Sequence, residues 1–318
     1  MRNLFQQMFV LLHQWWDSDY HPEGKEVVRA KPDKVDWKRC VPFIILHLGC
    51  LLVLVVGVSW TAVGIAVLLY LMRMFAITAF YHRYFSHRAF RTTRWAQWCF
   101  AVLGNTACQR GALWWASSHR HHHAHSDNEQ DLHSPSVRGF WWSHIGWIMS
   151  PDHEETLWEQ IPDLAKFPEL RFLNHFHLIP PTLYGIGMFL AFGWAGFFWG
   201  FVLSTVLLWH GTFTINSLSH VFGSVRYQTT DTSKNNFFLA MLTLGEGWHN
   251  NHHTYMSSTN NGFFWWEIDP TYYVIKTLSW LRVTSSLRKP PLHLLEAKRV
   301  RPRYVPLASA GEPVAEVS

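Results

Sequence analysis

The chain has 318 residues, of which 48% are hydrophobic and only 15% are charged. Soluble globular domains carry about 25% charged residues, so this composition argues against an ordinary soluble domain. The net charge of +5 would suit either a nucleic acid or an anionic membrane surface. The distribution of the charges along the chain favours the membrane and gives no reason to expect a nucleic-acid partner.

Residues 1–16 form the first apolar segment of an N-terminal region that we place at 1–40. Leu4, Met8 and Leu12 recur at helical spacing, and no small-residue cleavage site follows them. We therefore expect an amphipathic helix that lies on the membrane surface rather than a cleaved signal peptide.

Two later blocks, Val41–Tyr81 and Leu178–Ile215, contain no Lys, Asp or Glu, and their only Arg is Arg73. As a continuous helix each block would be about 60 Å long, twice the hydrocarbon thickness of a bilayer. Each block is therefore predicted to fold into a hairpin, with breaks near residues 57–60 and 193–196. The four expected spans are residues 41–58, 61–81, 181–196 and 197–217.

Charge around these blocks predicts the orientation. Lys25–Arg39 and the chain after Ile215 are basic, so the positive-inside rule places both termini and the middle loop in the cytoplasm. Trp95–Cys108 is apolar but too short to cross, and we expect an interfacial or buried helix there. Arg73 is expected to snorkel to the cytoplasmic interface. The prediction is an all-α integral membrane protein with a cytoplasmic helical cap, followed by an irregular tail over 284–318.

Histidines concentrate on the cytoplasmic side of these spans. The motifs "HRHHH" (119–123) and "HNNHH" (249–253) each place three imidazoles at positions i, i+3 and i+4, which share a helix face. His82 and His87 are five apart and would point about 140° away from each other on an α-helix, so one of them is expected beyond the helix end. With one histidine from "NSLSH" the set has nine members: His82, His87, His119, His122, His123, His220, His249, His252 and His253.

Nine imidazoles are too many for one ion and suit two ions with four or five ligands each, so we predict a dinuclear metal centre. Imidazole binds zinc, copper, iron and nickel. Hydrolytic zinc needs only three protein ligands, and soluble di-iron enzymes use two Glu-x-x-His motifs, of which Glu246-x-x-His249 is the one clear instance. Copper remains an alternative metal by ligand type, but iron is favoured because a site beside membrane spans suggests oxidation of hydrocarbon.

The order of "HRYFSH", "HRHHH", "NSLSH" and "GEGWHNNHH" resembles the integral-membrane fatty acid desaturases, in particular their acyl-CoA (stearoyl-CoA, delta-9) branch. The segments "RGFWWSHIGW", "DTSKNN" and "GFFWWEIDPTYY" extend the resemblance, which covers residues 41–283. It implies two iron ions held by the nine histidines, with Asn216 reaching one metal through a water, and O2 as co-substrate.

The resemblance also implies a narrow, kinked tunnel for the acyl chain, with Thr212 and Phe213 at the kink and Tyr70 and Met74 at its end. The sequence departs from the pattern of the animal enzymes at two places. Phe213 stands where the animal enzymes have Trp, which bears on the position of the double bond. Ser117-Ser118 replace an Arg-Asp pair that helps to recognise coenzyme A, which bears on the acyl carrier.

Three acids near the histidines, Asp127, Asp231 and Glu246, are candidates for orienting imidazole rings, with helix caps and loop hydrogen bonds as the alternative role. Gly245 and Gly247 flank Glu246 and either permit close backbone approach to a metal-binding helix or serve a turn.

The expected function is oxygen-dependent desaturation of a saturated fatty acyl chain, carried by coenzyme A and converted to a cis double bond at delta-9. The alternative is a fatty acyl or alkane hydroxylase on the same scaffold, and a more distant one is a non-catalytic metal or haem transporter or sensor. No HPGG-like haem motif occurs. We therefore expect electrons from a separate donor, a ferredoxin-like protein or a b-type cytochrome with its reductase, docking on the basic face. Membrane lipid is the other expected partner.

Overall fold

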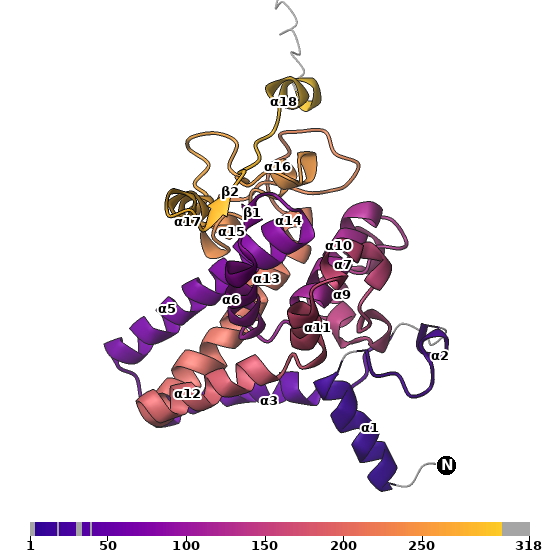
Figure 1. Ribbon diagram of the computed structural model, residues 1–318, viewed down its shortest axis with the longest axis vertical. Coiled ribbons are helices and arrows are strands. Elements are labelled where there is room, and N and C mark those ends of the chain that lie inside the picture. Colours follow the sequence, from indigo (N-terminus) through magenta and orange to yellow (C-terminus); the bar gives the residue numbers. More distant parts are fainter. Residues whose placement is uncertain (1–3, 18, 30–33, 39, 301–318) are drawn as a thin grey trace, which may run out of the picture.

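The computed structural model describes residues 4–17, 19–29, 34–38 and 40–300, and this part of the chain is mostly helical, as predicted, with one short strand pair. Apolar helices lie at one end and a cap of short helices at the other (Figure 1). The first half comprises α1 (Leu4–Trp16), α2 (Lys25–Arg29), α3 (Val41–Gly49), η1 (Cys50–Leu52), α4 (Val53–Val56), α5 (Trp60–Phe75), η2 (Ala76–Ser86), β1 (Arg91–Thr92), α6 (Arg94–Asn105), α7 (Ala112–His125), α8 (Pro135–Arg138), α9 (Phe140–His144), η3 (Gly146–Met149) and η4 (Pro151–His153). The second half comprises η5 (Trp158–Gln160), α10 (Pro162–Ala165), α11 (Pro168–His175), α12 (Ile179–Ala195), η6 (Gly196–Leu203), α13 (Ser204–Asn216), α14 (Leu218–Val221), α15 (Phe237–Leu242), α16 (His249–Thr254), α17 (Pro270–Trp280), β2 (Thr284–Ser285) and α18 (Leu292–Lys298).

The first apolar block breaks at the predicted position. The run α3–η1–α4 ends at Gly57, whose φ of +83° is disfavoured for residues with a side chain. Ser59 then caps α5 by accepting a hydrogen bond from the Ala62 amide. α5 continues without interruption into η2, where the helix widens to i→i+5 hydrogen bonding and ends at Ser86.

The second block also reverses where the sequence predicts. Gly193, near the end of α12, has a φ of +63° that interrupts the helix. The Tyr184 hydroxyl donates a hydrogen bond of 2.7 Å to the Gly200 carbonyl. In one continuous helix these two residues would lie about 24 Å apart. The chain therefore folds back on itself at Gly193, and α12 packs against η6 as a hairpin.

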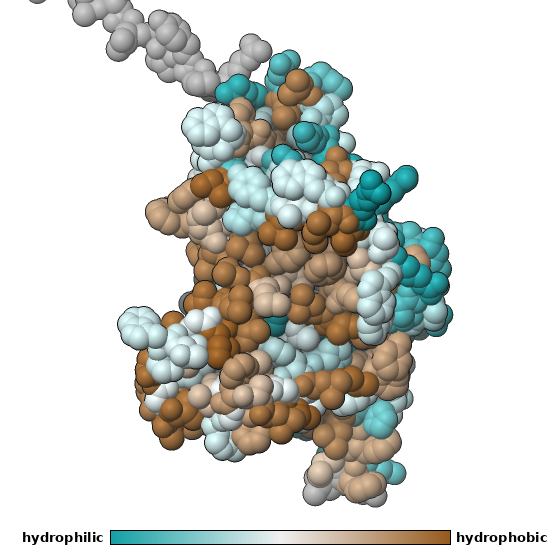
Figure 2. Space-filling model, turned by 60° about the vertical axis from the view of Figure 1, so that its left-hand side comes forward, coloured by the Kyte–Doolittle hydropathy of each residue, from teal (hydrophilic) through white to brown (hydrophobic). Residues whose placement is uncertain are grey.

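The outer faces of both hairpins are apolar. Leu54, Val55, Trp60 and Leu190 are each more than 70% exposed, and brown side chains cover much of this flank in Figure 2. By length and composition, two helices of the described chain could cross a membrane, Trp60–Ser86 and the Gly193-broken 179–221, while 41–56 is a shorter apolar helix. The count of four spans and the cytoplasmic side of the cap remain predictions.

Arg73 does not snorkel, so that expectation was wrong. Its side chain is 1% exposed, and its guanidinium donates to the hydroxyls of Ser204 and Thr205 (2.5 and 2.7 Å) and to the Thr106 carbonyl (3.2 Å). The cation also lies 4.9 Å from the centre of the Tyr184 ring. A set of neutral oxygen acceptors thus lets this charge remain buried, where it ties α5 to α6 and to the second hairpin.

Two other expectations concern the ends of the chain. Residues 4–16 form the predicted helix α1, with exposed apolar side chains such as Phe5 and Leu12. The tail is not irregular throughout: β2 pairs with β1, and α18 begins after Pro290-Pro291. A helix starts readily after a proline, whose fixed φ suits the first turn. The prediction for 301–318 lies outside the described residues.

The predicted buried helix near Trp95–Cys108 is α6, which covers the end of the Trp60–Ser86 helix. Phe100 stacks on Phe80 with ring centres 3.7 Å apart. The Tyr81 hydroxyl donates to the Ala101 carbonyl at 3.0 Å, and its ring lies against Gly104. This contact fixes the position of η2, on which the first metal-site histidine lies.

We expect Gly104→Ala to destabilise the protein, because its Cβ would lie 2.3 Å from the Tyr81 ring, which is fully buried and cannot move aside. Overpacking of this kind costs about 1–3 kcal/mol. Gly64→Ala is the matched control, since a Cβ there meets nothing within 4 Å and alanine favours a helix. The unfolding midpoints in detergent check this; equal midpoints for the two variants would contradict the close packing.

Candidate metal centre

Four segments far apart in the sequence bring the nine predicted histidines together. All nine lie in two neighbouring groups, and within each group the candidate ligand atoms lie within 4.8 Å of one another. The five-histidine cluster consists of His82, His87, His119, His123 and His252, and the four-histidine cluster consists of His122, His220, His249 and His253.

The wide turn of η2 explains the spacing of the first pair. His82 lies within η2, and His87 follows its last residue, as predicted for one of the two. Because i→i+5 hydrogen bonding adds about one residue to each turn, positions five apart come to the same side of the helix. The 140° separation expected for an α-helix therefore does not apply, and the two rings lie 4.9 Å apart.

The other histidines are divided between the clusters. On α7, His119 and His123 point into the five-histidine cluster while His122 points into the other. On α16, His252 joins the former, whereas His249 and His253 join the latter. Each HxxHH motif thus serves both groups, and the two clusters lie side by side.

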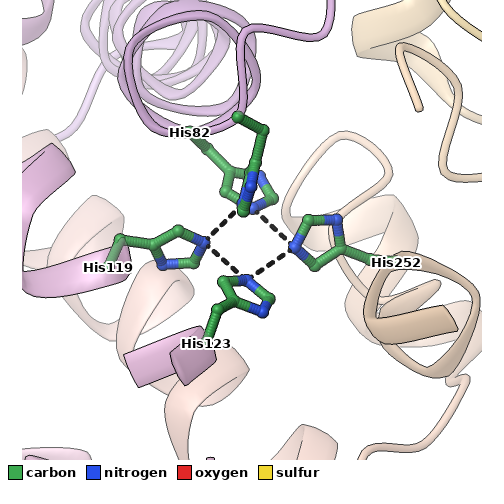
Figure 3. Close-up of side chains that lie close together, drawn as sticks. His82, His119, His123 and His252 are labelled. Atoms are coloured by element: carbon green, nitrogen blue, oxygen red, sulfur yellow. Dashed lines mark hydrogen bonds between the residues drawn. The ribbon is translucent and has the colours of Figure 1, made fainter. Parts of the chain in front are cut away.

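In the five-histidine cluster the Nε2 atoms converge (Figure 3). The His119 nitrogen lies 2.9 Å from that of His87 and 3.0 Å from that of His123. The His252 nitrogen lies 3.0 Å from those of both His82 and His123. The rings approach edge to face from different directions.

These contacts cannot all be hydrogen bonds. Each Nε2 has one in-plane site, either a proton or a lone pair, so it can serve one hydrogen bond and not two. Five lone pairs that point to one place match the ligand shell of a cation. With metal–nitrogen bonds of about 2.1 Å and neighbouring ligands about 90° apart, the nitrogens lie about 3.0 Å from one another. The donor set therefore fits a metal ion.

The four-histidine cluster has the same character. The Nε2 atoms of His220 and His249 lie 3.1 Å apart. The buried Nε2 of His253 has no hydrogen-bond partner among the described residues, as a metal-directed nitrogen would require. Nine imidazoles in two sets of five and four fit two ions.

Burial keeps five of the nine rings neutral. It lowers the pKa well below the ordinary histidine value, and repulsion between neighbouring imidazoles lowers it further, for His87, His119, His123, His249 and His252. Neutral imidazole is the form that binds metal, so the cluster carries available lone pairs at neutral pH.

The three predicted acids each lie against an Nδ1 atom, on the side of the ring that faces away from the clusters. Asp231 lies 2.7 Å from His253, Asp127 lies 3.3 Å from His220, and Glu246 lies 2.6 Å from His82.

Burial alone would raise the pKa of the Asp231 carboxyl, but its hydrogen bond and charge interaction with His253 outweigh burial, and its pKa falls below the usual range. An ionised carboxylate at Nδ1 fixes ring orientation and leaves Nε2 directed inward.

Sequence reasoning missed three residues beside the clusters. Asp131 accepts from the Nδ1 of His122 at 2.9 Å, and the ring of His133 lies 4.3 Å from that of His122. Arg83, 1% exposed, donates to Glu246 at 2.8 Å and to Asp269 at 2.8 Å. No spacing rule identifies them, because Asp131 and His133 reach His122 from the loop after α7 and the contacts of Arg83 join distant segments. The available signal was an arginine directly after His82 inside an apolar helix.

A cavity of about 750 Å³ leads from the histidines into the apolar hairpins. His82, His119 and His249 line one end. Its wall also includes five other predicted residues: Met74, Thr212, Phe213, Asn216 and Glu246. Tyr70 is not part of this wall; its hydroxyl donates to the Leu242 carbonyl at 2.7 Å, and its ring lies against Gly211, beside Met74.

The chain matches the fatty acid desaturase family over residues 58–278. It is 36% identical over 263 residues to the sn-1 stearoyl-lipid 9-desaturase of Anabaena variabilis, covering 81% of this chain and 96% of that protein. It is 38% identical over 267 residues to the sn-1 stearoyl-lipid 9-desaturase of a Synechocystis strain, covering 80% of this chain and 81% of that protein. The acyl-CoA 5-desaturase of Anemone leveillei is 36% identical over 290 residues, covering 86% of this chain and 88% of that protein.

These relatives act on chains carried by different groups, so the stearoyl-CoA branch expected from the motifs is not singled out. The family expectation itself is confirmed, and with it the class of reaction, desaturation of a fatty acyl chain by a membrane protein. The chain belongs to the fatty acid desaturase family.

Proposed function

We propose that this protein introduces a cis double bond at delta-9 of a saturated acyl chain, with O2 as co-substrate and two iron ions in the histidine clusters. The observation that carries the proposal is the cavity. It joins nitrogen-rich clusters to an apolar interior formed by residues such as Met74 and Phe213, so it suits a long hydrocarbon substrate.

The nine histidines would hold the two ions, five at one and four at the other, and Asn216, which lines the cavity, would reach a metal through water. When bound there, iron supplies the oxidising chemistry with O2 that removes hydrogen from an unactivated C–H bond. Asp127, Asp231 and Glu246 would hold the rings in place through Nδ1.

The cavity wall has the task of positioning the chain and excluding water. The Thr212 hydroxyl accepts a hydrogen bond from the Gln109 side chain at 2.8 Å, which fixes a polar pair in this wall. The Trp209 ring stacks on Phe43 with centres 5.1 Å apart and is held by a hydrogen bond to the Ala107 carbonyl. A rigid wall favours removal of hydrogen from two fixed neighbouring carbons over hydroxylation, the alternative chemistry on this scaffold.

For the acyl carrier we propose a membrane lipid in preference to coenzyme A. Pro42 and Ile45 of α3, and Thr182 and Ile186 of α12, line the cavity and are also exposed on the apolar flank. A cavity open on this flank would admit a chain whose headgroup stays in the bilayer.

Charge at the cavity supports the same carrier. Among the described residues that line it, Arg110 is the single Lys or Arg, and it forms an ion pair of 3.2 Å with Glu154. Coenzyme A carries several phosphate charges and would need more cations than this. Two of the relatives described above bear names that specify lipid-linked chains, which supports the proposal further.

Asp231→Asn should weaken metal binding. The uncharged amide would not hold His253 as the carboxylate does, and loss of such a partner lowers metal affinity about 10–100-fold. Glu169→Gln is the control, because Glu169 forms an exposed pair with Arg94, apart from the clusters. Iron per protein, measured across a titration of free Fe2+, checks this; equal occupancy in both variants would remove Asp231 from the proposed site.

Expression in a host that lacks its own desaturase should produce a new cis delta-9 monounsaturated fatty acid. His252→Ala should abolish it, because His252 touches two neighbours in the five-histidine cluster, whereas His293→Ala on α18 should not. Gas chromatography with localisation of the double bond measures this. A hydroxylated fatty acid that depends on His252 would instead establish the alternative oxygenase.

The carrier is tested by pulse-labelling such cells with stearate. We expect labelled monoene to appear in glycerolipids before it appears in acyl-CoA. Ile186→Trp, at the flank opening, should slow the conversion several-fold, whereas Leu190→Trp, on the same helix but away from the cavity, should not. Labelled monoene that appears first as acyl-CoA would show that coenzyme A is the carrier.

A further inference from the structure

A cluster of aromatic and arginine side chains lies on the surface of the cap. Trp265 is 87% exposed and Trp266 49% exposed, with their ring centres 5.6 Å apart. Phe264 stacks on Trp266 at 4.7 Å. The guanidinium groups of Arg226 and Arg299 lie over the Phe264 ring at 4.7 and 5.9 Å. These five residues form the aromatic–arginine patch.

The patch lies away from the apolar hairpins. Arg299 directly follows α18, and backbone hydrogen bonds of 2.8 Å join Gln228 to Lys298 and Val300 to Arg226. Figure 1 places α18 at the opposite end of the molecule from α3 and α12. The exposed tryptophans therefore lie apart from the apolar helices that would enter a bilayer. Trp and Arg are the residues most enriched among the energetic centres of protein interfaces, so the patch suits a protein partner.

Charge indicates the kind of partner. The segment 283–300, which carries α18, holds four Lys or Arg residues and one Glu. Within the patch itself, Arg226 forms an ion pair with Glu267, which is 2% exposed and presents no charge to the surface. A partner with an acidic surface would be attracted to this end of the cap.

A short connection joins the patch to the five-histidine cluster. Glu267 follows Trp266 in the chain and accepts hydrogen bonds from the backbone amides of Phe263 and Phe264 (2.8 and 3.2 Å). The same carboxylate oxygen accepts from the side-chain amide of Asn251 at 2.8 Å, and Asn251 directly precedes His252. One carboxylate and one amide thus separate the patch backbone from a histidine of the cluster.

We propose that the aromatic–arginine patch is the docking site of an acidic one-electron carrier protein that reduces the metal centre. The inference rests on the proposed function, because the electron balance of desaturation requires such a donor. Desaturation converts R–CH2–CH2–R′, O2, two electrons and two protons into R–CH=CH–R′ and two water molecules. The substrate gives up two C–H bonds and two electrons, O2 takes up four electrons, and the carrier supplies the other two, one at a time.

The test compares wild type with Trp265→Ala and Arg299→Glu, and with Trp280→Ala as the matched control, since Trp280 is 70% exposed on α17 but lies outside the patch. An acidic [2Fe–2S] ferredoxin and a soluble b-type cytochrome domain serve as separate probes. Their dissociation constants are measured on protein in nanodiscs, and the KM for each carrier is measured in desaturation assays. Metal content and unfolding midpoint report whether each variant is intact.

We expect both patch variants to weaken binding of at least one probe by roughly tenfold or more and to raise its KM correspondingly, with Trp280→Ala like wild type. Added salt should weaken wild-type binding more than that of Arg299→Glu. Unchanged dissociation constants for both probes in the patch variants would overturn the proposal. So would tight binding that appears only in a chain ending at Val300, because residues 301–318 would then be the occupant of the patch.

Two further arms separate this proposal from the function on which it rests. Photoreduced methyl viologen, a small reductant, is supplied to wild type in place of the carrier. Desaturation with viologen, together with carrier dissociation constants that are unchanged in the patch variants, would overturn the docking site. The proposed function would then still stand. No desaturation with any reductant would count against the proposed function, while the dissociation constants would still decide the docking site.

Discussion

The convergence of the Nε2 atoms of neutral histidines is the constraint on which the rest of the structure depends. Lone pairs about 3 Å apart in a buried space repel one another unless a cation lies between them. The carboxylates lie on the opposite side of the rings, at Nδ1, where they hold the imidazoles in this otherwise unfavourable arrangement. The structure is thus organised around two positions of high negative potential.

Arg83 connects this arrangement to the fold. It joins Glu246, which lies against His82, to Asp269, which caps α17 by accepting from the Tyr272 amide. The two glycines around Glu246 permit the close packing. Gly245 has φ +116° and lies against Asp269, and a Cβ on Gly247 would be 2.1 Å from the Ala240 backbone nitrogen. Gly245 therefore serves a turn, whereas Gly247 permits close approach to α15, which carries no histidine, and not to a metal-binding helix.

Local patterns in the sequence predicted much of this molecule. Charge-free blocks and their glycines predicted the hairpins and the turns at Gly57 and Gly193, and HxxHH spacing predicted which histidines gather. Contacts that helical spacing does not encode escaped prediction. The burial of Arg73 depends on hydroxyls more than 130 positions away. The contact of Asp131 with His122 depends on the loop that follows α7, and no periodicity encodes such a contact.

The division of the histidines among segments also has a consequence for stability. η2 belongs to the membrane-facing helix Trp60–Ser86, whereas α7, α14 and α16 belong to the cap, so a metal ion in the five-histidine cluster would join the two parts. Binding energy of this kind becomes folding energy when the ligands come from distant segments. The cavity starts at the same junction, with His82 and His119 in its wall. The position of an acyl chain in this cavity relative to a metal in the cluster would therefore be set by the same contacts that attach the cap to the hairpins.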